Sequence, residues 1–128
     1  MNKNIKLKKY LILSTKNIKQ AIMQINKYGL KLVCVVNEKS YLIGTVSDGD
    51  VRRGLLKNIT LNESVKKIMN KRPKAIGLKT KKNEIRKIFT KFDVQALPIL
   101  DKKGKLLDIL PKDKENYFEN IIYIVAGG

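Results

Sequence analysis

The residues best suited to chemistry lie in one short stretch, Gly44-Thr-Val-Ser-Asp-Gly-Asp-Val-Arg-Arg53. An apolar run typical of a strand leads into it, and its second half predicts a helix with Ser47 as N-cap and Asp50 three residues later. Free backbone N–H groups and the helix dipole favour an anion at such a point. Asp50 is the residue type that holds the vicinal hydroxyls of a ribose, and Arg52 and Arg53 add positive charge. The stretch therefore indicates a nucleotide half-site.

The same spacing also has a purely structural interpretation. Ser47-x-x-Asp50 is the spacing of a capping box, and Thr60-x-x-Glu63 shows it a second time. Two details favour a ligand. Asp is shorter than the Glu or Gln that closes such a box well. Gly49 lowers helix stability by about 1 kcal/mol, a loss that makes sense if a ligand needs the space beside it. Both interpretations stay open here. Asp48 and Gly49 are included among the candidate site residues.

Several classes of protein are excluded by composition. The 128 residues contain no His and one cysteine, Cys34, so an internal disulfide, a cysteine–histidine zinc site and histidine-based catalysis are unavailable. Cys34 lies in an apolar run and is predicted to be a small buried hydrophobe. No apolar run approaches the ~20 residues of a membrane span, and the N-terminus lacks the apolar segment of a signal peptide. We expect a cytoplasmic module without a membrane partner.

The net charge of +17 suggests nucleic acid, but its distribution does not favour it. Only four of the 28 basic residues are Arg, the residue that makes bidentate contacts to bases and phosphates. The lysines are spread along the whole chain, without a basic tail. We therefore interpret most of the charge as solvated surface, with nucleic acid as an unlikely partner.

The chain repeats itself at a spacing of 64 residues. The predicted strands Leu32–Val36 and Tyr41–Val46 recur as Ala96–Leu100 and Lys105–Leu110. Asn and Asp side chains bond the backbone two residues on, and they open the two turns between these strands, as Asn37 and Asp101. The apolar positions of two predicted helical faces keep the same offset: Ala21, Ile25 and Tyr28, then Ile85, Phe89 and Phe92. Internal duplication follows.

The remaining elements complete two β-α-β-β-α units. Short strands at Tyr10–Leu13 and Ala75–Leu78 precede the two helices, with Thr15 and Thr80 as predicted N-caps. Thr60-x-x-Glu63 and the apolar spacing after it predict a connecting helix over Leu61–Met69.

With these elements in place, the chain resembles a tandem pair of CBS domains, a Bateman module, over about residues 5–118. The resemblance implies an α/β (α+β) fold with two repeats packed as a pseudo-twofold pair. We expect residues 1–58 to form the first repeat and 59–118 the second with its connecting helix. Residues 119–128 would be a linker and the start of a further domain.

The resemblance also assigns roles to residues. In the family a Ser or Thr contacts phosphate or ribose and an Asp binds the ribose hydroxyls, and Ser47 and Asp50 match these positions. The analogy suggests that Lys31 and Thr15 complete the site. The second repeat departs from the pattern, because its corresponding residues are Asp108, Pro111 and Lys114, with Asp113 one position off. We therefore expect at most one nucleotide site per chain.

Two features resemble proteins that carry a transferase. Asp48–Arg53 is similar to CBS pairs attached to sugar-nucleotide transferases. Ile121–Gly128 resembles the first strand and opening glycines of a nucleotidyltransferase fold. A terminal strand with a flexible end is the alternative for that tail. The resemblance implies that these residues are the regulatory, non-catalytic front of a longer nucleotidyltransferase.

The resemblance as a whole implies a regulatory module that binds an adenosine nucleotide, AMP, ADP or ATP, or a related nucleotide between its repeats and modulates the attached sugar nucleotidyltransferase. No cofactor is required, and neither a catalytic residue nor a metal ligand is predicted. A ligand-free homodimerisation module is the alternative, and a basic nucleic-acid-binding domain is the third.

Overall fold

The chain divides into two compact units, Met1–Pro73 and Lys74–Gly128. The structure, a computed structural model, describes residues 7–112. Residues 119–128, predicted as a linker and the start of a further domain, therefore lie outside the described residues. None of the described helices has the length and apolar character that a membrane crossing requires.

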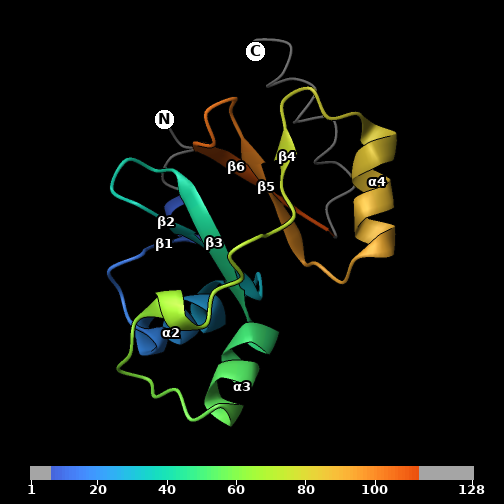
Figure 1. Cartoon of the computed structure of the whole chain (residues 1–128). Coiled ribbons are helices and arrows are strands. Elements are labelled where there is room, and N and C mark those ends of the chain that lie inside the picture. Colours follow the sequence, from blue (N-terminus) through green and yellow to red (C-terminus); the bar gives the residue numbers. More distant parts are fainter. Residues whose placement is uncertain (1–6, 113–128) are drawn as a thin grey trace. The chain divides into compact units, whose positions relative to one another are not determined.

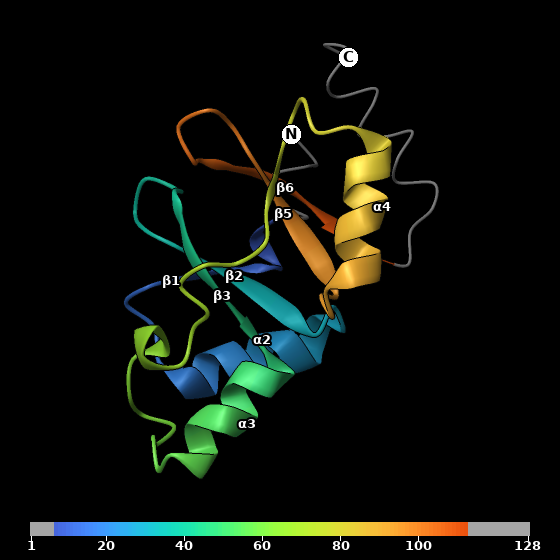
Figure 2. The ribbon, with the colours of Figure 1, turned by 45° about the vertical axis from the view of Figure 1, so that its right-hand side comes forward.

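The first unit is a three-stranded sheet with helices. Its described elements, in chain order, are β1 (Leu11–Leu13), α2 (Ile18–Tyr28), β2 (Leu32–Val36), β3 (Leu42–Ser47), α3 (Asp48–Leu56) and the short 3₁₀ helix η1 (Val65–Lys67) (Figure 1). The strand order is β1-β2-β3, with β1 parallel and β3 antiparallel to β2. Helices α2 and α3 lie side by side against this sheet (Figure 2).

The second unit repeats this plan. Its described elements are β4 (Ile76–Gly77), α4 (Lys82–Lys91), β5 (Ala96–Leu100) and β6 (Leu106–Pro111), with strand order β4-β5-β6. The strand register also repeats at the offset of 64: Ile12 pairs with Val35 and Ile76 with Ile99. Both antiparallel pairs shift register at the same point, between Val35 and Val36 and between Ile99 and Leu100. The predicted duplication is thus present in the hydrogen-bond pattern.

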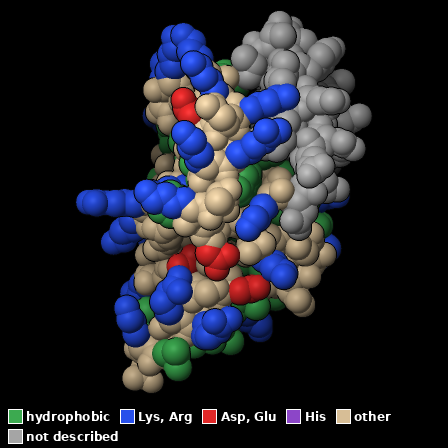
Figure 3. All heavy atoms as spheres, turned by 90° about the vertical axis from the view of Figure 1, so that its right-hand side faces the viewer, with side chains coloured by type: hydrophobic (Ala, Val, Ile, Leu, Met, Phe, Trp, Pro, Cys, Tyr) green, Lys and Arg blue, Asp and Glu red, His purple; other side chains and the backbone are tan. Residues whose placement is uncertain are grey.

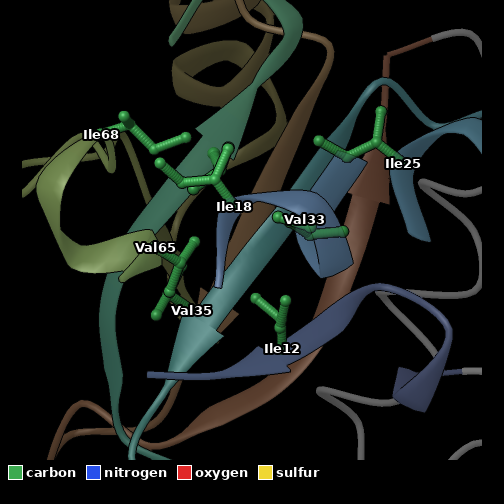
Figure 4. Packing of buried hydrophobic residues seen from close by; sticks show 9 residues of the cluster. Ile12, Ile18, Ile25, Val33, Val35, Val65 and Ile68 are labelled. Atoms are coloured by element: carbon green, nitrogen blue, oxygen red, sulfur yellow. The ribbon is translucent and has the colours of Figure 1, made fainter. Parts of the chain in front are cut away.

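Each unit has its own hydrophobic core. In the first, alternate residues of the sheet, Val33 and Val35, meet Ile18 and Ile25 of α2, while Val65 of η1 closes the cluster (Figure 4). Five buried residues form the second core: Ile76, Ile85, Leu97, Ile99 and Leu110. Each of these five follows a member of the first core by 64 residues. Because side chains alternate along a strand, Cys34 points to the opposite sheet face from Val33 and Val35, and it is buried, as predicted.

The turns between the antiparallel strands are built alike. The Asn37 side chain accepts hydrogen bonds from the N–H groups of Lys39 at 2.9 Å and Tyr41 at 3.0 Å. Asp101 accepts from Lys103 at 2.8 Å and Lys105 at 2.9 Å. The N–H group of Lys105 is the main cause that lowers the pKa of Asp101, because these donors stabilise the carboxylate. The predicted local role of these Asn and Asp residues is confirmed.

The predicted N-caps of α2 and α4 were wrong, by two residues and by one residue respectively. Helix α2 is capped by Asn17, whose side chain accepts from Gln20 N at 2.9 Å, while the Gln20 side chain accepts from Asn17 N at 3.0 Å. Thr15 lies before this capping box. Helix α4 has Lys81 as its N-cap without a side-chain bond. Thr80 instead accepts from Gly77 N at 2.9 Å and closes the preceding turn.

The predicted connecting helix over Leu61–Met69 is also wrong. This segment contains only the 3₁₀ helix Val65–Lys67, because neighbouring backbone groups fix it in an irregular path. Ser64 forms an isolated bridge with Asn17, and Asn70 forms one with Thr45. Since an α-helix cannot satisfy both bridges, tertiary pairing overrides the apolar spacing. The segment packs on the first unit, although the sequence grouped it with the second.

Candidate functional site

The candidate site lies where β3 ends and α3 begins. Ser47 is the last residue of β3 and pairs with Leu32, the first residue of β2. Its backbone is extended, with φ −110° and ψ 171°, and the helix follows immediately. The end of a paired strand thus holds the helix N-terminus at a fixed place on the sheet.

Hydrogen bonds lock Ser47 and Asp50 together. The backbone N–H of Asp50 donates to Ser47 Oγ at 3.2 Å, and the backbone N–H of Ser47 donates to Asp50 Oδ2 at 2.9 Å. Ser47 Oγ also donates to Asp50 Oδ2 at 3.0 Å. The structural interpretation of this spacing, a capping box, is therefore realised. Asp closes the box in spite of its short side chain.

The other carboxylate oxygen faces a different partner. Arg53 Nη2 donates to Asp50 Oδ1 at 2.8 Å, and the two side chains are 66% and 13% exposed, respectively. An ion pair with one member this exposed contributes about 0–1 kcal/mol. Arg52 is exposed on the same helix. Asp50 Oδ1 is thus a nearly buried acceptor whose present partner can be displaced at low cost.

The two glycines of the motif serve different purposes. A Cβ on Gly49 would lie 3.3 Å from the flexible end of Arg53, so packing does not require a glycine there. A Cβ on Gly44 would lie 2.7 Å from Met69 Sδ and 2.8 Å from Asn70 O, closer than atoms tolerate. Gly44 is therefore needed for the close passage of the 69–70 segment. The sequence motif contains Gly44 but does not reveal this reason.

The two outer candidates lie at different ends of the sheet. Lys31 precedes Leu32, the strand partner of Ser47, and has a left-handed backbone with φ 66°. Its exposed side chain starts close to the N-terminus of α3. Thr15 follows β1, whose last residue Leu13 pairs with Val36. Val36 and Leu32 are four residue steps apart along β2, or about 13 Å of strand. The first unit thus brings Ser47, Asp50, Arg53 and Lys31 to one end and leaves Thr15 at the other.

The second unit offers different chemistry at the equivalent place. Pro111 takes the register position of Ser47, opposite Ala96, and has neither a hydroxyl nor a backbone N–H. Asp108 takes the position of Gly44, and its carboxylate accepts from Ile109 N at 2.8 Å. Lys114 and Asp113 lie outside the described residues. Among residues 7–112, His, Cys, Asp and Glu form no cluster of three or more that could hold a metal.

The structure also contains a groove that the sequence does not indicate. A cavity of about 470 Å³ lies against β1, lined by Leu11, Lys16 and Gln24 among others. No motif marks these residues, because the groove depends on the way α2 lies against the edge of the sheet. It does not include Ser47 or Asp50.

Comparison with protein families and curated proteins gave consistent matches. The family model described as "CBS domain" matches residues 2–57 and 65–113. An uncharacterized protein of Helicobacter pylori strain J99 is 32% identical over 101 residues, which are 78% of this chain and 31% of that protein. Arabinose 5-phosphate isomerase GutQ of Salmonella typhimurium is 30% identical over 92 residues, 70% of this chain and 28% of that protein. The chain thus spans about a third of these relatives' length.

Solved structures match over nearly the whole chain. The CBS domain protein PAE2072 from Pyrobaculum aerophilum, complexed with AMP, has a TM-score of 0.72 at 15% identity and covers 92% of this chain and 91% of its own. CBSX2 in complex with AMP has a TM-score of 0.72 at 21% identity and covers 88% of each chain. At these identities the likeness concerns the fold.

Proposed function

The chain belongs to the CBS domain family, and from this premise we propose that its first repeat binds an adenosine nucleotide and regulates an attached enzyme. The predicted tandem pair and its mixed α+β fold are confirmed. The observation that carries the proposal is the Ser47–Asp50 pair at the N-terminus of α3. Two structural neighbours of the same fold hold AMP, which supports an adenosine nucleotide as the ligand.

The charges at this helix end fit a nucleotide better than a free phosphate. Asp48 and Asp50 place two carboxylates in the first turn, which suits hydroxyl donors and disfavours a phosphate directly above them. Asp50 Oδ1 can accept from a ribose hydroxyl once Arg53 leaves it. The released guanidinium, with Lys31 and Arg52 nearby, then supplies positive charge for phosphate. The capping box and nucleotide binding are therefore compatible, because they use different oxygens of Asp50.

A thermal-shift series on the 128-residue chain tests the proposal. AMP, ADP and ATP at 100-fold excess over Kd should add about 2.7 kcal/mol of stability, which moves the midpoint by several degrees. Cytidine and guanosine nucleotides, tested at the same concentrations, show whether the shift is specific for adenosine nucleotides. Asp50→Asn should remove most of the shift, because the amide keeps the size of the side chain but loses the paired acceptors.

Glu38→Gln is the matched control for that variant. It removes one exposed negative charge from the same unit, in the turn after β2, and should leave the nucleotide shift unchanged. The proposal fails if no nucleotide raises the midpoint. It also fails if Asp50→Asn responds to AMP as the original chain does.

For the attached enzyme we propose one that acts on a phosphorylated or nucleotide-linked sugar. The sugar nucleotidyltransferase expected from the resemblance rests on Ile121–Gly128, outside the described residues. Similarity to arabinose 5-phosphate isomerase GutQ supports a sugar-phosphate isomerase as the alternative. The reading frame on both sides of these 128 codons distinguishes the two. A nucleotide can change the activity of either enzyme only if it binds one conformation of the pair better than another.

An assembly role is the second candidate, and exposed leucines favour it. Leu55 and Leu56 at the end of α3 are 46% and 78% exposed, and Leu61 nearby in sequence is 40% exposed. A homodimer that uses this end of α3 would cover them. Light scattering of the original chain and of Leu56→Glu tests this role. A dimer that the charged variant disrupts supports it, and a monomer at all concentrations contradicts it.

A further inference from the structure

The groove against β1 adjoins a second cavity on the first unit, and among residues 7–112 β1 is an edge strand that pairs only with β2. One cavity has a volume of about 470 Å³ and the other about 600 Å³. Both are lined by the same four residues, Lys8, Leu11, Gln20 and Gln24, so the two adjoin. Each alone has the size of a small-molecule pocket, and together their lining extends from Lys27 and Tyr28 at the end of α2 to Glu38 and Ser40 after β2. All lining residues come from positions 8–40, within one unit.

The edge of β1 presents donors to this groove. Tyr10 O accepts from Cys34 N at 2.7 Å, and Ser14 N donates to Val36 O at 3.0 Å. Because backbone groups alternate along a strand, those of Leu11 and Leu13 face away from β2. Their carbonyls already accept bonds, Leu11 O from the Gln24 amide and Leu13 O from Lys16 N at 3.0 Å. As far as residues 7–112 are concerned, this edge therefore offers a ligand mainly the N–H groups of Leu11 and Leu13.

The charge of the groove favours an anionic ligand. Four lysines line it, at positions 8, 9, 16 and 27, together with a single acidic residue, Glu38. Lys9 and Lys27 lie over the ring of Tyr28 at 5.7 and 5.3 Å from its centroid. Leu11 and Leu13 contribute apolar surface between these charges, and Leu13 is 40% exposed. On the face that Figure 3 draws, Lys and Arg side chains are spread over the surface. At the groove the lysines flank edge N–H groups and apolar side chains.

We propose that this groove binds an extended acidic segment of a partner protein, which pairs with the open edge of β1. An extended chain fits the length of this lining, its carbonyl oxygens accept from the edge N–H groups, and its carboxylates meet the lysines. Alternate apolar side chains of the segment would cover the exposed leucine. The proposal is independent of the nucleotide site, because it shares no residue with it.

Fluorescence anisotropy with a labelled ten-residue peptide of alternating Glu and Leu tests the proposal, on the whole chain at about 0.15 M salt. Binding should weaken about tenfold or more in Lys8→Glu/Lys16→Glu, since two contacts turn repulsive. Leu13→Pro should weaken it comparably by removing one edge N–H. Lys102→Glu/Lys103→Glu, in the turn of the second unit, is the matched control and should change the affinity less than about twofold.

Other results overturn the proposal. Equal weakening by both double-lysine variants would show general attraction of an anion to a basic protein. Equal binding of a Lys–Leu peptide would exclude charge recognition. If the chain self-associates and Lys8→Glu/Lys16→Glu abolishes this, the groove belongs to a second copy. Full displacement of the peptide by citrate would assign it to a small anion. Unchanged unfolding midpoints in the lysine variants exclude misfolding as the cause of any loss.

Discussion

At the scale of single residues, the two interpretations that the sequence offers for Asp50, a helix cap and a ribose acceptor, are compatible with each other. One of its oxygens closes the cap of α3, and the other holds an exposed arginine. A cap that is already formed fixes the carboxylate rotamer before any ligand arrives, which lowers the entropy that binding would cost. In the proposed site the cap would therefore preorganise Asp50 as a ribose acceptor, and evidence for the cap does not weaken the case for the ligand.

The cap itself predicts a stability effect without nucleotide. Ser47→Ala removes the acceptor for Asp50 N and the hydroxyl donor to Asp50 Oδ2. We expect a loss of about 1 kcal/mol in the free energy of unfolding, measured by urea titration. Ser47→Thr keeps the hydroxyl and should lose much less. Equal stability of the Ala and Thr variants would contradict the capping role.

Cys34 predicts a pH effect. Burial raises the pKa of its thiol from 9.0 to about 12. The unfolded thiol ionises first, so the contribution of Cys34 to stability is complete below about pH 9 and declines as the pH rises towards 12. Urea titrations at several pH values above 9 should show a steeper loss for the original chain than for Cys34→Ala, by up to about 1.4 kcal/mol per pH unit. Parallel losses would contradict the burial of the thiol, since titration of Lys and Tyr affects both proteins alike.

At the scale of elements, strands were predictable and connections were not. The strands follow from apolar runs that recur at one spacing, and both copies must bury the same faces. Asn17-x-x-Gln20 also has capping-box spacing and could have replaced Thr15 as the predicted cap. The segment around Val65 and Ile68 could not be predicted as irregular. Its path depends on backbone bridges to Asn17 and Thr45, which no local pattern records.

The segment around Val65 and Ile68 packs closely against α3 at Gly54. A Cβ on Gly54 would lie 2.4 Å from Ile68 Cγ2, so Gly54→Ala should destabilise the chain by about 1–3 kcal/mol although alanine favours helix. Gly49→Ala is the control on the same helix. Its Cβ meets only the movable end of Arg53, so without ligand it should be neutral or stabilising. Urea titration measures both. Similar effects of the two substitutions would contradict the close contact at Ile68.

At the scale of the molecule, the two copies of the unit share their packing but differ in the residues at the position of the proposed site. The register and the core are kept, since every buried residue of the second core has a counterpart in the first. Ser47 and Asp50, the residues of the proposed site, are present in the first unit, whereas Pro111 stands in place of Ser47 in the second. The repeat was visible in the sequence because packing constrains many positions. Whether a copy carries the proposed site depends on two or three residues, and the sequence could indicate this only through the motif.

The division into units predicts how the chain can be shortened. Val65 is fully buried and Ile68 is 8% exposed, and both belong to the core of the first unit. A fragment of residues 1–73 should therefore fold alone and unfold cooperatively, whereas a fragment of residues 1–58 lacks both side chains. Burial of two such residues contributes about 1.5–3 kcal/mol each, a large part of the stability of so small a unit.

Thermal unfolding followed by circular dichroism, with amide exchange of β2 and α2, separates these outcomes. The longer fragment should show a sigmoidal transition and protected strand amides, and the shorter one neither. Adding Ile68→Ala to the longer fragment should cost about 2–5 kcal/mol, because a buried isoleucine is truncated. If the shorter fragment folds as stably as the longer one, the 64–70 segment is a linker that rests on the first unit without supporting it. If only the shorter fragment loses the cooperative transition, the 64–70 segment is part of the first repeat's core. Asn70 of this segment bridges Thr45 of β3, the strand that ends at Ser47. A displacement of the link to the second repeat would then act directly on β3.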